Sequence, residues 1–280
     1  MRVSSLACGL HCLLRFNSVK VKEIVRALEL VAPLPLQEDY DNAGLQVGLT
    51  EADVSGVLLC LDVTEAIVDE AVSKGCNLIV AHHPLIFRRL AHLTGDDYVQ
   101  RTVVKAVKND VAIMAMHTNL DNARGGVNFK MAEKLGLNDV QFLSPAHTVD
   151  GVEGASGVIG RLPESIPAAD FLALLKRVFG VACIQANELL RRPIKTVALC
   201  GGAGAFLLDD AIHAGADAFV TGEMSYHQYF GHEQQTQIAV IGHYQSEQYT
   251  SELLKEIIEE RFPSLVCHLA ETTTNPIVIF

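Results

Sequence analysis

The sequence lacks several features that would assign it at once to a class of protein. No apolar run approaches the roughly 18 residues needed to cross a bilayer, so we expect no membrane-spanning helix. Glycine and proline are few and scattered, with 21 and 9 residues among 280, which argues against collagen-like and disordered chains. The Walker A, GxSxG and HExxH motifs are also absent.

Positive charge is scarce as well. The chain has 22 basic residues against 33 acidic ones, a net charge of −11. Such a surface repels phosphate backbones and anionic membranes, which disfavours nucleic acids and membranes as partners. A local basic pocket could still hold one small anion.

The seven cysteines form no CxxC pair and no zinc-ribbon spacing. Cys60, Cys76 and Cys200 lie inside or beside apolar strand-like runs, where a free thiol behaves as a small hydrophobe. We therefore expect reduced cysteines and a cytoplasmic location.

Residues 1–18 contain a short apolar run between Arg2 and Arg15. The run resembles a weak signal or transit peptide, but His11 interrupts it and no good cleavage site follows. We expect a disordered extension or a misassigned start codon here, on which the fold does not depend.

From residue 19 onward, apolar strand-like runs alternate with helical patterns. Strands are predicted at 54–61, 77–81, 111–116, 196–200, 218–221 and 238–242, and helices at 64–74, 99–109, 125–135, 166–179, 206–214 and 247–261. This alternation is typical of an α/β layered fold with largely parallel strand pairing.

An internal repeat is the most informative pattern. Residues 57–81 match residues 197–221 at a constant offset of 140, and both segments read as strand, helix, glycine turn and strand. A second match, at offset 126, aligns Met116–Asp121 with Gly242–Glu247, each an apolar strand end followed by His and, four residues later, a carboxylate. We infer two related α/β halves that face one another.

The glycine-rich stretch 144–157 predicts the joint between these halves. We place the first half at 19–143 and the second at 144–280. Each half is expected to have three layers and a mixed, largely parallel sheet, with a cleft between the halves.

Polar residues that directly follow the predicted strands mark a candidate site, because ligands bind at the carboxyl ends of strands in open α/β sheets. These residues are His82, His83, His117, Asp121, Glu223, His243 and Glu247. Five of them would make a mixed nitrogen and oxygen site for two ions: His82, His83, Asp121, His243 and Glu247. Imidazole and carboxylate suit zinc, manganese, iron or nickel, and the absence of thiolates argues against a closed structural zinc site.

Each signal also has a plainer interpretation. A single histidine at a strand end is often a capping or core residue, and His82-His83 alone would fit either interpretation. The duplicated pattern at His243 and Glu247 favours the metal site. The turn Gly201–Phe206 could cradle a phosphate on its backbone N–H groups or serve only as a tight strand–helix turn.

Several motifs together resemble the NGG-one-interacting factor three (Nif-three-like) family. They are Asp41-Asn42-Ala43-Gly44-Leu45-Gln46-Val47-Gly48, His82-His83-Pro84-Leu85, His117-Thr118-Asn119-Leu120-Asp121, Thr221-Gly222-Glu223-Met224-Ser225 and Gly242-His243-Tyr244-Gln245-Ser246-Glu247. The resemblance covers nearly everything from Val19 to the end. It implies a dinuclear metal centre between two α/β halves, and a toroidal homohexamer.

By the same resemblance, His82 and His243 would hold one metal ion, His83 and Asp121 the other, and Glu247 would bridge both. His117 and Glu223 would orient ligands, contact the substrate or transfer a proton. Many relatives carry an inserted middle domain, for which this chain has no room between Phe142 and Gly157.

Such a site predicts a metal-dependent hydrolase that acts on a small molecule, with a metal-bridging water as the nucleophile. Some members of the family are labelled GTP cyclohydrolase I type 2, so the substrate could be a nucleotide, and phosphoester hydrolysis suits the same site. The alternative function is a non-catalytic metal-binding scaffold or regulatory protein that forms a ring oligomer.

Overall fold

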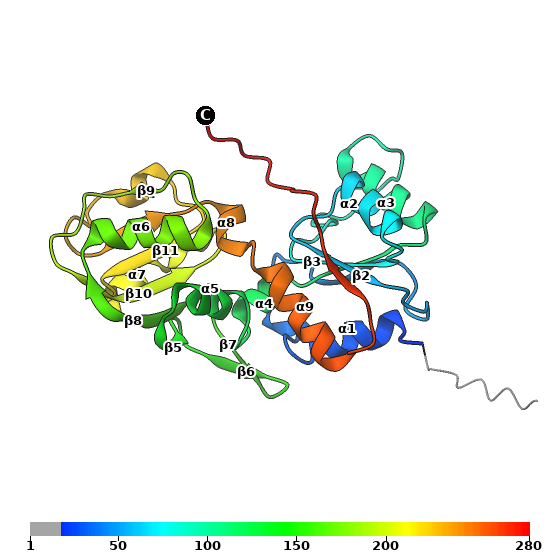
Figure 1. Cartoon of the computed structure of the whole chain (residues 1–280), viewed down its shortest axis with the longest axis horizontal. Coiled ribbons are helices and arrows are strands. Elements are labelled where there is room, and N and C mark those ends of the chain that lie inside the picture. Colours follow the sequence, from blue (N-terminus) through cyan, green and yellow to red (C-terminus); the bar gives the residue numbers. More distant parts are fainter. Residues whose placement is uncertain (1–17) are drawn as a thin grey trace, which may run out of the picture.

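The computed structural model describes residues 18–280, so the expectation for residues 1–17 lies outside the described part of the chain. Two β-sheets, each with helices packed on both faces, form two lobes that lie side by side (Figure 1). This architecture confirms the predicted α/β class with mixed, largely parallel sheets.

The first sheet has the strand order β1-β4-β3-β2-β13. Its strands are β1 (Gly44–Val47), β2 (Val57–Cys60), β3 (Leu78–Ala81), β4 (Ala112–Ala115) and β13 (Cys267–Leu269). β1 runs antiparallel to β4, and the other neighbours are parallel. The helices α1 (Val21–Glu29) and α9 (Thr250–Arg261) pack on one face, and α2 (Glu65–Ser73) and α3 (Tyr98–Lys108) pack on the other.

The sequence of β3 explains why both faces are covered. Leu78 and Val80 pack into the core on the α1 and α9 side, whereas Ile79 and Ala81 pack on the α2 and α3 side. Successive side chains of a strand point to opposite faces, so four consecutive apolar residues make a strand that is buried on both sides.

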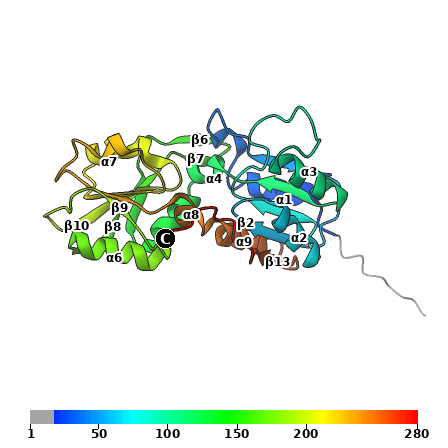
Figure 2. The ribbon, with the colours of Figure 1, turned by 90° about the horizontal axis from the view of Figure 1, so that it is seen from above.

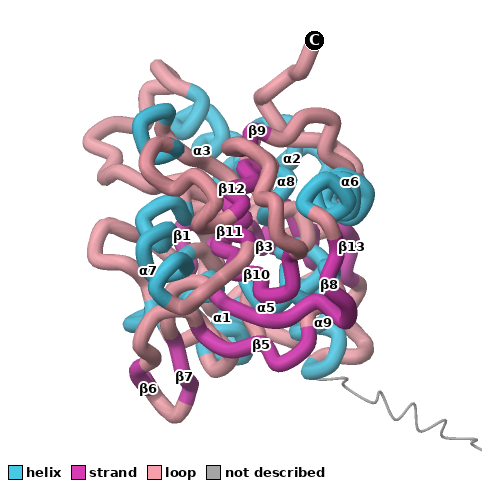
Figure 3. Tube along the Cα trace, turned by 90° about the vertical axis from the view of Figure 1, so that its left-hand side faces the viewer, coloured by secondary structure: helices cyan, strands magenta, loops and turns pink. Residues whose placement is uncertain are grey.

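The second sheet has the order β5-β8-β10-β11-β12-β9. Its strands are β5 (Asn138–Phe142), β8 (Val158–Ile166), β9 (Gln185–Ala186), β10 (Ile194–Cys200), β11 (Ala218–Thr221) and β12 (Gln237–Val240). β10, β11 and β12 are parallel, and the outer strands are antiparallel to their neighbours. The helices α5 (Val127–Leu135) and α6 (Ala168–Phe179) pack on one face and α7 (Leu208–His213) on the other, as the end-on view shows for α6 and α7 (Figure 3).

The internal repeat has a structural counterpart. β2, α2 and β3 form a parallel strand–helix–strand unit in which Val57 pairs with Leu78. β10, α7 and β11 form the same unit, in which Val197 pairs with Ala218. The registers of the two units therefore differ by the same offset of 140 residues that relates their sequences.

Sheet membership crosses the boundary that the sequence suggested at residues 143 and 144. β5 and α5 precede that boundary but belong to the second sheet and its core. Conversely, α9 and β13 lie near the end of the chain but return to the first lobe, where β13 pairs with β2. The chain thus passes between the lobes more than once.

Short elements complete the fold. They are the hairpin of β6 (His147–Val149) and β7 (Val152–Gly154), the helices α4 (Thr118–Asn122) and α8 (His243–Glu247), and the 3-10 turns η1 (Leu34–Leu36), η2 (Gly204–Leu207) and η3 (Tyr226–Tyr229). None of the helices in residues 18–280 has the length and apolar character that crossing a bilayer requires. Cys60, Cys76, Cys183, Cys200 and Cys267 are all free thiols.

Candidate metal centre

The carboxyl ends of the parallel strands in the two sheets meet where the lobes adjoin. His82 and His83 follow β3, and His117 follows β4 and precedes α4. Glu223 follows β11, and His243 opens α8 after β12. The two short helices α4 and α8, which contribute Asp121 and Glu247, lie between the lobes (Figure 2).

Glu247 lies at the middle of this cluster. Its Oε1 is 3.7 Å from Nε2 of His82, which in turn is 3.6 Å from Oδ1 of Asp121. Its Oε2 is 2.9 Å from Nε2 of His83 and 3.1 Å from Nε2 of His243. The structure therefore brings together all five residues that the sequence suggested as metal ligands, and each carboxylate oxygen of Glu247 faces a different group.

The spatial grouping differs from the pairing that the resemblance implied. His83, and not His82, lies beside His243, with 3.3 Å between their Nε2 atoms, and His82 lies beside Asp121. The reason is local, because adjacent residues of an extended chain point to opposite sides. His82 turns into the buried first lobe, and His83 turns toward the second lobe.

The four histidines of the site each form a hydrogen bond through Nδ1. In each case the partner is a carbonyl or carboxylate oxygen, which can only accept, so Nδ1 is the donor. The acceptors are the carbonyl oxygen of Met116 for His82 (2.8 Å), Asp62 for His83 (2.7 Å), Asp41 for His117 (2.7 Å) and Glu223 for His243 (3.0 Å). A neutral imidazole that donates from Nδ1 leaves the lone pair of Nε2 for a ligand. Metal-binding histidines are typically held in this way.

His82 supplies the strongest test of whether these residues fit a metal ion. Its side chain is fully buried, and its Nε2 has no hydrogen-bond partner among residues 18–280. An unpaired buried polar atom costs about 1–3 kcal/mol, and such atoms are rare in native structures unless an ion or water satisfies them. A divalent ion between His82, Asp121 and Glu247 would satisfy this atom, so the donor set fits.

When no metal is bound, protons balance the carboxylates of the site. Burial raises the pKa of Asp121, and the negative charge of Glu247 raises it further. Burial opposes the charge of Glu247 too, but the neighbouring histidines, His82 above all, hold the pKa of Glu247 well below its usual range. Burial lowers the pKa of His83, yet hydrogen bonds to Asp62 and Glu247 outweigh it and raise the pKa to about 10. Protons thus occupy the cluster when it holds no metal, and metal binding would have to displace them.

His117 and Glu223 lie at the edges of the five-residue cluster. The His117 ring packs at 5.3 Å from the His82 ring and 5.4 Å from the His83 ring, and its donor atom lies close enough to theirs to serve as a further ligand. Glu223 reaches the cluster only through Nδ1 of His243, and its side chain is 58% exposed. Its contact with the cluster is therefore the hydrogen bond to the ring of His243.

Two aspartates in the site were missed by the sequence reasoning. Asp62 directly follows the predicted strand 54–61, so the strand-end rule that identified His82 would have identified it too. Asp41 was quoted only as part of a family motif. Burial raises its pKa, but hydrogen bonds from His117 and Thr118 outweigh this and lower the pKa to about 2, so Asp41 stays ionised behind His117.

We expect the substitution Asp62→Asn to weaken metal binding without unfolding the protein. Asp62 is partly exposed and joins Nδ1 of His83 to the hydroxyl of Thr274, so an amide of the same shape can replace it. The loss of a carboxylate behind a metal-binding histidine typically costs about 10- to 100-fold in metal affinity. Competition with a chelator would measure the change. Asp69→Asn, on the exposed side of α2, is the matched control and should leave the affinity unchanged.

The glycine turn after β10 packs against the site. The N–H of Gly201 donates to Oδ1 of Asn128 and the N–H of Gly202 donates to Oγ of Ser246, both at 2.9 Å. These two N–H groups are already satisfied within the protein, which favours the tight-turn interpretation. The turn instead packs against the carboxylate of Glu247, which lies so close that a Cβ atom at Gly202 would come within 2.2 Å of it.

A family model described as Duf34/NIF3 (NGG1p interacting factor 3) matches residues 19–276. The chain belongs to the DUF34/NIF3 family. This assignment confirms the resemblance that the histidine motifs suggested.

Individual relatives agree with the family assignment. This NIF3 family chain is 33% identical over 249 residues to a Clostridium perfringens protein named GTP cyclohydrolase 1 type 2 homolog, a match that covers 88% of the chain and 94% of the relative. It is 30% identical over 214 residues to NIF3-like protein 1 of Drosophila melanogaster, covering 76% and 72%. The crystal structure of a Bacillus cereus protein related to NIF3 matches with a TM-score of 0.83 at 26% identity, covering 94% of this chain and all of that one.

Proposed function

We propose that this chain is a hydrolase that depends on two divalent metal ions held between its two lobes. The observation that carries the proposal is the buried Nε2 atom of His82, which has no partner in the described chain and lies 3.7 Å from a buried carboxylate. Buried polar groups of this kind mark sites that are built for a ligand.

The residues divide into two ligand sets. His82 and Asp121 would hold one ion, His83 and His243 would hold the other, and Glu247 would contribute one oxygen to each. When bound, two neighbouring divalent ions lower the pKa of water and stabilise the negative charge that develops on a substrate. Five ligands shared between two ions leave room for water and substrate, which a closed structural site does not. Zinc, manganese, iron and nickel all suit these donors.

His117 is the residue that we propose for proton transfer. Asp41 holds its Nδ1 at 2.7 Å, which fixes the ring and leaves Nε2 to accept a proton from a reacting group or return it. Glu223 would contribute by keeping the ring of His243 in place.

The substrate class is supported by the names of the relatives. A relative that is 33% identical to this chain is named GTP cyclohydrolase 1 type 2 homolog. We therefore propose a nucleotide or a related phosphoester as the substrate. We also propose that the chain forms a ring-shaped homohexamer, as the family resemblance implies.

A single experiment tests the function. The metal content of purified protein would be measured by elemental analysis, and the same protein would be screened for hydrolysis of GTP and of simple phosphoesters with and without a chelator. We expect about two metal ions per chain and hydrolysis that the chelator abolishes. Two bound ions without hydrolysis of any substrate would favour the non-catalytic scaffold, and the absence of metal would overturn the proposal. Light scattering on the same sample would give the oligomeric state.

A further inference from the structure

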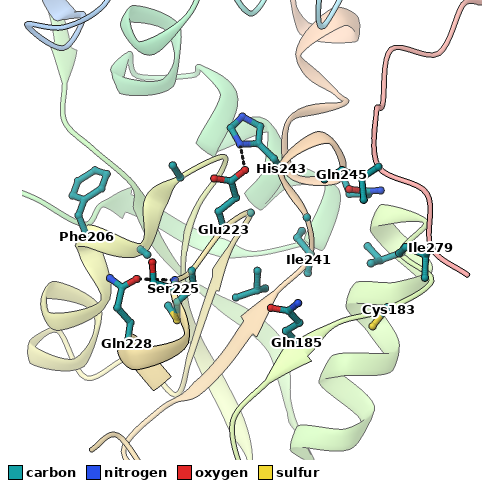
Figure 4. Close-up of a pocket in the computed structure, with 18 of the residues that line it drawn as sticks. Cys183, Gln185, Phe206, Glu223, Ser225, Gln228, Ile241, His243, Gln245 and Ile279 are labelled. Carbon is teal, nitrogen blue, oxygen red and sulfur yellow. Dashed lines mark hydrogen bonds and ion pairs between the residues drawn. The ribbon is translucent and has the colours of Figure 1, made fainter. Parts of the chain in front are cut away.

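A cavity of about 880 Å³ in the second lobe opens beside His243. Residues that follow β11 and β12 line it, among them Met224 and Ile241. Part of the lining comes from the last residues of the sequence, because the segment Ile277–Ile279 reaches the cavity from the first lobe (Figure 4). The cavity is therefore bordered by a segment that belongs to neither sheet.

The base of this segment is held on the first lobe. The backbone N–H groups of residues 271 and 272 donate to the carboxylate of Glu70, at 2.8 and 3.0 Å. The hydroxyl of Thr274 donates to Oδ2 of Asp62 at 2.7 Å, and Oδ1 of the same aspartate accepts the hydrogen bond from His83. A single aspartate thus joins the base of the segment to a histidine of the candidate metal centre.

Beyond Thr274 the chain is no longer held in this way. Within residues 18–280, the hydrogen bond that follows is internal to the segment, from the N–H of Ile277 to the side chain of Asn275. Pro276 has no N–H, so it cannot donate to the edge of a sheet. The segment therefore combines a fixed base with an unanchored end.

The unanchored end is apolar and lies open to water. Ile277, Val278 and Ile279 are 64%, 70% and 54% exposed, and Phe280 is fully exposed. Each of these side chains is stabilised when it leaves contact with water, so four of them in succession favour a position in which they are covered.

The adjoining cavity offers such a position. Val181, Val240 and Ile241 line it with apolar side chains that are themselves buried. The end of the segment carries no charged side chain, so no side-chain charge has to leave water when it packs there. Four extended residues span at most about 14 Å, and a sphere of this volume is about 12 Å across, so the segment can cover the cavity while its base stays in place.

We propose that residues 277–280 form a strap that closes over this cavity and packs its apolar side chains against the cavity walls. The chain turns at Asn275 and Pro276 while Thr274 stays bound to Asp62. The closed strap limits access to the metal centre on the side of His243. Only this last consequence rests on the proposed function, because closure itself needs no metal.

Alkylation of Cys183 in the full chain measures closure. Cys183 is an exposed free thiol that lines the cavity, so a closed strap shields it. Its rate of reaction with iodoacetamide would be followed by mass spectrometry of the peptides. We expect the wild type to react about tenfold more slowly than the double variant Ile277→Ser/Ile279→Ser, whose polar strap gains less from leaving water. Val72→Ser, an exposed position of α2, is the matched control and should react as the wild type does. Equal rates in the wild type and the double variant would overturn the proposal.

A disulfide tests whether the strap covers the cavity of its own chain. Ile279 and Cys183 lie at the same end of the cavity (Figure 4). In an Ile279→Cys protein, mild oxidation should therefore join the new thiol to Cys183 within one chain. Failure of this disulfide to form would contradict closure. A disulfide between two copies, visible on a non-reducing gel, would show that the segment covers a neighbouring copy and would also overturn the proposal.

The disulfide-locked protein then tests access to the metal centre. After loading with zinc, it should lose metal to a chelator at least about threefold more slowly than Ile279→Cys/Cys183→Ser, which cannot be locked. Equal rates of metal loss would overturn the effect on access. Slow alkylation of Cys183 in a protein that binds no metal would overturn the proposed function and leave closure standing. Metal-dependent hydrolysis with equal alkylation rates would do the reverse.

Discussion

Replacing Glu247 with alanine is expected to remove both metal ions from the protein. The two carboxylate oxygens face different groups, Oε1 toward His82 and Oε2 toward His83 and His243. Each proposed ion would lose a buried anionic ligand, and the histidines that remain would repel one another and the ions once protonated. Loss of a directly binding carboxylate should exceed the roughly 10- to 100-fold loss that is typical of outer-shell substitutions.

Elemental analysis after dialysis would measure this effect against the wild type. His82→Ala should lose mainly one ion, because His83 and His243 keep the other set. Glu259→Ala should retain the full metal content, because Glu259 is a half-exposed glutamate of α9 whose ion-pair partner within residues 18–280 is Lys255. Equal metal content in wild type and Glu247→Ala protein would show that the ions, if any, bind elsewhere.

Many residues of this site could be predicted from the sequence because they directly follow buried strands, whose carboxyl ends form the ligand-binding edge of a parallel sheet. His82, His117 and His243 each follow a run of buried apolar residues, and such runs end at the same edge of a parallel sheet. The repeat then implied that two such edges exist, and the structure places them against each other. Sequence pattern is informative here because burial of the strands leaves the chain little freedom at their ends.

The direction of each side chain could not be predicted in this way. His82 and His83 are adjacent, and only the packing of β3 beside β4 decides that His82 reaches the carbonyl oxygen of Met116. The role of Asp41 depends on a contact with His117, 76 residues away along the chain. Such contacts depend on how distant segments meet, which local spacing does not encode.

The lobe in which the last elements pack could not be predicted for the same reason. The pattern of α9 and β13 predicts an amphipathic helix and a short strand, but both lobes offer a sheet on which they could pack. The parallel pairing of Cys267 with Val57 settles the choice in favour of the first lobe. This return also brings Thr274 to Asp62, so the end of the chain contributes to the site.

The second large effect is expected from Gly202→Ala, although Gly202 carries no functional group. Its backbone has φ +57°, and an added Cβ atom would lie 2.2 Å from Oε1 of Glu247. The carboxylate is buried and held by histidines, so it has little room to give way. The left-handed conformation alone costs alanine about 1–2 kcal/mol, and the displaced carboxylate should lower the affinity for both metal ions at least about tenfold.

Gly215→Ala provides the matched control for this substitution. Gly215 has φ +73°, but no heavy atom lies within 4 Å of the position of its added Cβ. Gly215→Ala should therefore lose a similar amount of free energy of unfolding. Its metal affinity should equal that of the wild type. Thermal denaturation of the metal-free proteins and chelator competition on the loaded ones separate the two effects. The opposite outcome would be a Gly202→Ala protein that loses no more stability than Gly215→Ala and binds metal normally. The new methyl group would displace Glu247, on which both proposed ligand sets depend. Normal metal binding would therefore show that Glu247 is not the shared ligand.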